Sequence, residues 1–122
     1  MYITRDFLRR NRGSVIFVFG DNLLRRGKGG AASLRDEPNA YGFITKRAPD
    51  NRDSSFFKPS DYADVFKIEM AKLERLILSR PTTRFYISKL GGGLANRYHI
   101  FEQVIQPALA RLPEKYSNVI LI

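Results

Sequence analysis

The stretch Ser14-Val-Ile-Phe-Val-Phe-Gly20 decides the fold that this sequence predicts. Five consecutive apolar residues in it are β-branched or aromatic, and glycines stand at both ends of the run. Such a run is typical of a strand that is buried on both faces, as strands are in a parallel sheet. We therefore expect other elements to cover both faces of the sheet that contains this strand.

Three further strands are expected along the chain, over Tyr41–Lys46, which is weaker, Arg84–Ser88 and Asn118–Ile122. A short helix is expected over Ala31–Arg35, and Pro38 stops it. Each later strand is separated from the preceding one by a helical or loop segment. This alternation is typical of strands that lie parallel to one another.

Two longer helices complete the predicted order of elements. Ser60 is the expected N-cap of the first, which runs to about Arg80 and ends before Pro81. Asn96 is the expected cap of the second, in which Pro107 predicts a kink or a break. The order predicts one α/β domain over residues 1–122, with a mostly parallel sheet in a three-layer α/β/α arrangement. Ligands of such folds collect at the carboxyl ends of the strands.

Composition excludes several classes of function. The 122 residues include no cysteine, which excludes disulfide scaffolds, thiolate metal sites and cysteine nucleophiles. The one histidine, His99, excludes a histidine-rich metal cluster, and we expect neither a metal nor a cofactor. No segment approaches the ~20 apolar residues of a membrane span, and no signal peptide is recognisable. We expect a cytoplasmic protein without membrane contact, whose oligomeric state the sequence leaves open.

The net charge of +9 favours an anionic partner. Residues 1–58 carry twelve basic and six acidic side chains, whereas residues 59–122 carry nine and six. The basic excess therefore lies mainly in the N-terminal half. A nucleotide, a nucleic acid and an acidic protein are all compatible with this charge.

Two glycine-rich loops carry the strongest functional signal. Each follows a strand and precedes a helix, where backbone N–H groups can cradle an anion. Neither loop matches the P-loop or dinucleotide-binding spacings. For the first loop, a flexible basic segment that contacts a nucleic-acid backbone is the alternative. The glycine-loop residues predicted to bind ligand are Gly20, Gly27, Gly29 and Gly30 in the first loop, and Gly91, Gly92, Gly93 and Leu94 in the second.

Polar side chains near these loops supply further candidates. Asp21 and Asn22 follow the first strand and are candidates for ligand contact and, more weakly, for catalysis; an Asx turn is the alternative. His99 is more typical of a surface or capping histidine than of a general base. Five cations are candidates for pairing with phosphate, with solvated charge as the alternative: Arg25, Arg26, Lys28, Lys46 and Lys89.

Four segments carry a resemblance to a known family: Phe17–Ala32, Tyr41–Lys46, Leu90–Ala95 and Asn118–Leu121. The first contains Val-Phe-Gly-Asp-Asn-Leu and Gly-Lys-Gly-Gly-Ala-Ala, and it resembles the ligand loop of macro-domain-like proteins. More closely, the chain is similar to a macro-domain-like family of small, uncharacterised bacterial and bacteriophage proteins. The order of the four segments is more specific than any one of them.

The resemblance implies a macro-domain-like fold that binds ADP-ribose or a relative. It implies that Asn22 meets the distal ribose, that Gly29 and Gly30 belong to the same loop, and that Gly91–Gly93 form the diphosphate loop. We therefore predict that the chain binds an ADP-ribose-type or other nucleotide ligand across the two glycine-rich loops. The alternatives are a nucleic-acid-binding protein that uses the basic N-terminal half, and a hydrolase of ADP-ribosyl or N-glycosidic bonds.

Overall fold

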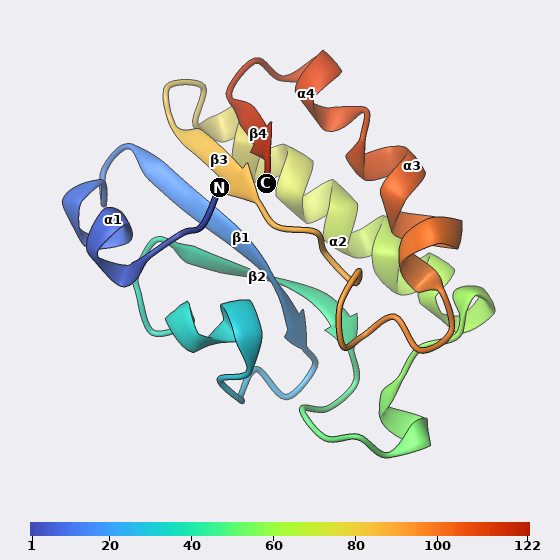
Figure 1. Cartoon of the computed structure of the whole chain (residues 1–122). Coiled ribbons are helices and arrows are strands. Elements are labelled where there is room, and N and C mark those ends of the chain that lie inside the picture. The colour runs from blue at the N-terminus through green and yellow to red at the C-terminus, as the bar shows by residue number, and fades with distance from the viewer.

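A computed structural model describes all of residues 1–122 and contains one four-stranded sheet (Figure 1). The strand order is β2-β1-β3-β4, and every neighbouring pair is parallel. The strands span β1 (Val15–Asn22), β2 (Ala40–Lys46), β3 (Arg84–Ile87) and β4 (Val119–Leu121). The predicted α/β class and parallel sheet are confirmed.

Alternating side chains of β1 contribute to two separate hydrophobic cores. Val18 points into the larger core, whereas Phe17 and Phe19 point into the smaller one on the opposite face. The same alternation divides Phe85 and Tyr86 of β3. This period of two is the pattern of a strand that is buried on both faces.

Helices of unequal size cover the two faces. The larger core lies under α2 (Pro59–Ser79) and under a C-terminal run made of the π-helical turn η3 (Phe101–Ile105), α3 (Gln106–Leu109) and α4 (Leu112–Lys115). The smaller core lies under α1 (Arg5–Arg10) and the 3-10 helix η1 (Gly30–Leu34). A second 3-10 turn, η2 (Asp53–Ser55), lies in the connection between β2 and α2. The arrangement is compatible with three layers, one of them thin (Figure 1).

Several element boundaries differ from those that the sequence predicts. The long helix begins at Pro59, not after Ser60, because proline occupies its first turn and the Asp61 carboxylate accepts from the N–H of Lys58 (3.2 Å). The expected helix near Ala31–Arg35 is the 3-10 helix η1. The N-terminal helix α1 was not predicted; Thr4 Oγ1 caps it by accepting from Phe7 N–H (3.1 Å).

The last helical run changes from π-helical to α-helical geometry directly before Pro107, and it is interrupted further on. The π-helical turn η3 leads directly into α3, so Pro107 lies within a continuous helical run, and the π-helical turn ends two residues before it; a proline and a π-helical turn are both sites at which helices kink. The break falls at Ala110 and Arg111, between α3 and α4. Asn96 is not the N-cap residue, because the helical run begins at Ile100, but its Oδ1 accepts from Phe101 N–H (3.0 Å) in the first turn.

Side chains occupy the outer edge of β2. The N–H of Ile44 donates to Glu69 Oε1 (2.8 Å), and its carbonyl accepts from the Tyr62 hydroxyl (2.6 Å). Two residues earlier, the carbonyl of Gly42 accepts from Arg25 Nη1 (3.0 Å). The edge strand therefore has hydrogen-bond partners where no neighbouring strand is present.

None of the helices is both long and apolar enough to cross a bilayer.

Candidate functional site

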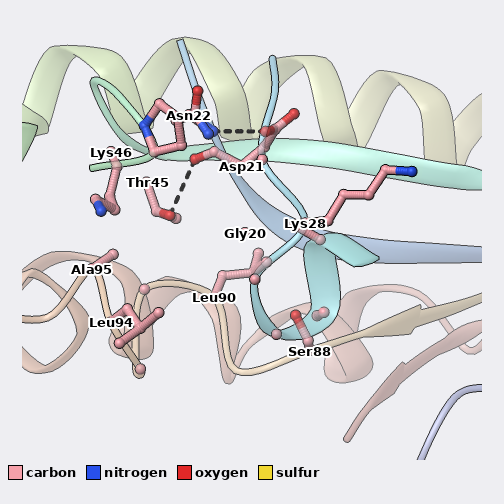
Figure 2. A pocket seen from close by; sticks show the side chains of 18 of the residues that line it. Gly20, Asp21, Asn22, Lys28, Thr45, Lys46, Ser88, Leu90, Leu94 and Ala95 are labelled. Atoms are coloured by element: carbon pink, nitrogen blue, oxygen red, sulfur yellow. Dashed lines mark hydrogen bonds between the residues drawn. The ribbon is translucent and has the colours of Figure 1, made fainter. Parts of the chain in front are cut away.

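A cavity of about 420 Å³ lies beyond the carboxyl ends of β1 and β3 (Figure 2). The connection after β1 passes over one face of the sheet through η1, and the connection after β3 passes over the other through η3 and α3. A crevice forms in parallel sheets where neighbouring strands diverge in this way. Its wall comprises Gly20, Asp21, Asn22, Arg26, Gly27, Lys28, Gly29, Gly30, Ala31, Ala32, Thr45, Lys46, Pro49, Ser88, Lys89, Leu90, Gly91, Gly93, Leu94 and Ala95.

The cavity brings together most of the residues that the sequence singles out, but not Arg25 or Gly92. Arg25 turns toward Asp21 and the carbonyl of Gly42. A Cβ on Gly92 would lie 2.7 Å from Cγ of Lys89, so this glycine packs against the Lys89 side chain. Whether the lining residues bind a ligand stays a prediction.

Some lining residues are not among those predicted from the sequence. Ser88 directly follows β3, and Thr45 lies one residue before the end of β2, where its hydroxyl donates to the Asp21 carbonyl (3.3 Å). Figure 2 shows Thr45 and Lys46 on the same side as Asp21 and Asn22, with Leu90, Leu94 and Ala95 across the cavity. Their position at strand ends was the available signal.

The Asp21 carboxylate is the only acidic side chain in the cavity wall, and it is already paired. It is 5% exposed. Its Oδ1 accepts from Arg35 Nη2 (2.6 Å) and from the N–H of Asn22 (2.8 Å), and its Oδ2 accepts from Arg35 Nη1 (3.2 Å) and Arg25 Nη1 (3.3 Å). This arrangement fixes the carboxylate and neutralises its charge.

The Asn22 amide stabilises the first glycine-rich loop from within. Its Oδ1 accepts from Leu24 N–H (3.1 Å), which is the Asx turn that the sequence left as an alternative. Its Nδ2 donates to the carbonyl of Arg26 (2.7 Å). Both ends of the amide therefore hold the loop beside the cavity.

Backbone N–H groups without partners line both sides of the cavity. In the first loop, the N–H groups of Gly27, Lys28 and Gly29 make no hydrogen bond within the chain; in the second, the same is true of Gly91 and Gly93. Gly27 and Gly91 have positive φ values of 96° and 74°. A backbone with glycines in this conformation can present successive N–H groups to one anion.

Four cations line the cavity without a carboxylate partner: Arg26, Lys28, Lys46 and Lys89. Lys46 Nζ donates to the carbonyl of Asp50 (2.7 Å) and lies 4.5 Å from the centre of the Phe56 ring. Burial lowers the pKa of Lys46, and the Asp50 carboxylate opposes this shift. The cavity wall therefore carries an excess of positive charge.

The connection 47–58 is docked at the rim of the cavity. Phe56 and Phe57 are 4% and 2% exposed, so they attach this loop to the core. At the rim, a Cβ on Gly27 would lie 2.9 Å from Pro49 Cβ. The carboxylate of Asp53 accepts from the Tyr98 hydroxyl just beyond the second glycine-rich loop, and this bond lowers the pKa of Asp53.

His99 and the remaining acidic groups form no second site. The imidazole is exposed, does not line the cavity, and lies 3.5 Å from Glu102. No group of three or more histidine, aspartate or glutamate side chains is placed to hold a metal ion. The chemistry that the cavity offers is therefore the recognition of an anion by N–H groups and cations.

A family model described as a family of unknown function (DUF7831) matches residues 1–96. The chain belongs to this family. The matched range includes β1, β2, β3 and every residue of the cavity wall. No curated protein and no solved structure matches the chain.

Proposed function

We propose that this protein binds an anionic nucleotide-type ligand, of the ADP-ribose class, in the cavity between the two glycine-rich loops. One observation carries the proposal: four unpaired cations and unpartnered N–H groups surround a cavity whose single carboxylate is neutralised. Charge-assisted hydrogen bonds to phosphate are stronger than those between neutral groups. The volume of about 420 Å³ lies within the range of small-molecule sites, roughly 300–1,000 Å³.

The ADP-ribose class is the finer part of the proposal, and it comes from the resemblance of the loops to those of macro-domain-like proteins. A nucleotide diphosphate also suits a cavity with cations on both sides, because Arg26 and Lys28 belong to one loop and Lys89 to the other. The exposed Leu94 at the rim offers apolar surface for a sugar or a base.

Binding without turnover fits the cavity better than hydrolysis does. A hydrolase needs a group that activates water or protonates a leaving group. Asp21 is paired with Arg35, the Asn22 amide is hydrogen-bonded within its own loop, and no histidine lines the cavity. We therefore expect no release of ADP-ribose from an ADP-ribosylated peptide.

The basic N-terminal segment is partly neutralised, which disfavours the nucleic-acid alternative. Arg5, Arg9 and Arg12 surround the buried carboxylate of Glu37, and Arg5 also pairs with Asp36. Arginines that contact a nucleic-acid backbone need their guanidinium groups free for phosphates. Arg26, Lys28 and Lys46 of the same half have no carboxylate partner, and all three line the cavity.

Titration calorimetry with ADP-ribose, ADP, pyrophosphate and adenosine tests the proposal. We expect the three anions to bind and adenosine to bind weakly or not at all. A ligand at 100 times its Kd stabilises the fold by about 2.7 kcal/mol, which a thermal melt also detects. Failure of all three anions to bind overturns the proposal. Binding of a twelve-nucleotide oligomer alone, with a steep salt dependence, favours the nucleic-acid alternative.

Matched variants locate the binding site. Lys28→Glu reverses a charge in the cavity wall, and Arg75→Glu makes the same change in net charge on the exposed face of α2. A lost charge-assisted bond costs roughly 1.5–3 kcal/mol, so we expect Lys28→Glu to weaken binding at least tenfold. Arg75→Glu should leave the Kd within about twofold. Equal effects of the two variants would place the ligand elsewhere.

Gly93→Val tests the backbone of the second loop. A Cβ on Gly93 meets no atom within 4 Å, so the fold should tolerate a side chain that projects at the cavity wall. Gly13→Val is the control, since its Cβ also enters open space and lies outside the cavity. Weaker anion binding by the first variant alone is the expected result. Unchanged binding would remove this loop from the site.

A further inference from the structure

Arg35 contacts the first glycine-rich loop at two consecutive backbone carbonyls. Its Nε donates to the carbonyl of Gly27 (2.7 Å), and its Nη2 donates to the carbonyl of Arg26 (3.2 Å). The same guanidinium holds both oxygens of Asp21. Arg35 follows η1, its side chain is 15% exposed, and it is not part of the cavity wall.

These bonds fix the direction of two peptide planes. Every peptide bond in the chain is trans, so the C=O and the following N–H point in opposite directions. The carbonyls of Arg26 and Gly27 point toward Arg35, and Asn22 Nδ2 holds the first of them as well. The N–H groups of Gly27 and Lys28 must therefore point away from Arg35. Both residues line the cavity, and neither N–H has a partner within the chain.

We propose that Arg35 is a positioning residue: it orients the N–H groups of Gly27 and Lys28 toward the cavity so that the first loop binds a phosphate group. This inference rests on the proposed function and assigns a part of it to a residue outside the cavity wall. Asp21 serves as the anchor of Arg35. Its carboxylate fixes the guanidinium in the plane from which Nε and Nη2 reach the two carbonyls.

The geometry requires arginine. A guanidinium carries five N–H donors in a planar fork, whereas a lysine ammonium is a single compact charge on a flexible stem. Arg35 serves four acceptors, the two Asp21 oxygens and two successive carbonyls, whereas the three N–H donors of a lysine ammonium cannot serve all four. The guanidinium carbon lies 5.4 Å from the centre of the Phe19 ring, which further limits its freedom.

The test measures pyrophosphate binding by calorimetry and the backbone amide signals by NMR. We expect Arg35→Lys to raise the Kd for pyrophosphate at least tenfold. We also expect the amide signals of Gly27 and Lys28 to stop responding to pyrophosphate, while those of Gly91 and Gly93 still shift. Arg5→Lys is the control, because Arg5 also holds a buried carboxylate and a backbone carbonyl but lies in α1, outside the cavity wall.

A second variant separates positioning from neutralisation of charge. Asp21→Asn combined with Arg35→Gln removes both charges and leaves no uncompensated carboxylate in the cavity wall. If Arg35 acts by positioning, this double variant binds pyrophosphate weakly as well. Binding at the wild-type level by either variant, with unchanged responses of Gly27 and Lys28, overturns the inference alone. Failure of the wild-type protein to bind any phosphate ligand overturns the proposed function together with it.

Discussion

Gly91→Ala should destabilise the protein through the second glycine-rich loop. Gly91 has a φ of 74°, which costs a residue with a side chain about 1–2 kcal/mol. A Cβ at this position would lie 2.5 Å from Cδ1 of Ile105 and 3.5 Å from Cδ1 of Ile100, both in the larger core. Overpacking of a core costs about 1–3 kcal/mol, so the sum is about 2–5 kcal/mol. This loss should lower Tm by on the order of 10 °C.

Urea denaturation of a double-mutant cycle with Ile105→Val measures this clash directly. Valine lacks the methyl group that the new Cβ would strike, and alone it should cost about 0.5–1.5 kcal/mol. In the Gly91→Ala background the same change relieves the contact, so the double variant should be more stable than the sum of the two by about 1 kcal/mol or more. Gly13→Ala is the control, with open space around its Cβ. Strict additivity, or a Gly91→Ala variant as stable as the control, would refute the reasoning.

Three further predictions concern the edge of the sheet and the rim of the cavity. Tyr62→Phe leaves the Ile44 carbonyl without its donor and should cost about 1–3 kcal/mol in urea denaturation. Burial raises the pKa of Tyr62 above the ordinary 10.0, so wild-type stability should fall as the pH rises above about 10 more steeply than that of the phenylalanine variant. Glu69→Ala should cost about 1–3 kcal/mol by unpairing Ile44 N–H, and Glu69→Gln should cost less because its oxygen can still accept that bond; equal losses would contradict this account. The hydrogen bond from Tyr98 lowers the pKa of Asp53 below its ordinary value of 3.8. The stability that Asp53 contributes should therefore be present above pH 3.8 and lost as the pH falls below it, so the Tm values of Asp53→Asn and wild type in thermal melts should converge in acid.

The strands could be predicted because a buried strand appears in the sequence as a local run of apolar residues. The apolar run of residues 14–20 gave β1, but the strand continues to Asn22 because β2 pairs with it as far as Lys46. That extension depends on a partner strand, which local composition does not reveal. Helix α1 was missed because Leu8 is its single buried residue, too few for a helical period to appear.

The position of the site could be predicted from the sequence, but the contacts of its side chains could not. Strand ends and glycines located the cavity, since parallel strands end at the same edge. The directions of loop residues were not predictable: Arg25 turns to Gly42, and Gly92 packs against Lys89. Arg35 was not predicted as a site residue because its partners lie eight to fourteen residues away in the sequence and contact it only after folding.

The occupied edge of β2 restricts how two copies of this chain could share a sheet. A foreign strand at that edge would have to displace Tyr62, Glu69 and Arg25 from the backbone groups that they hold. Extension is left to β4, at the opposite edge, where only three residues are strand. Two copies joined there about a two-fold axis would run antiparallel, so their cavities would open at opposite ends of the joined sheet. Such a pair would present two separated binding sites and not one shared pocket.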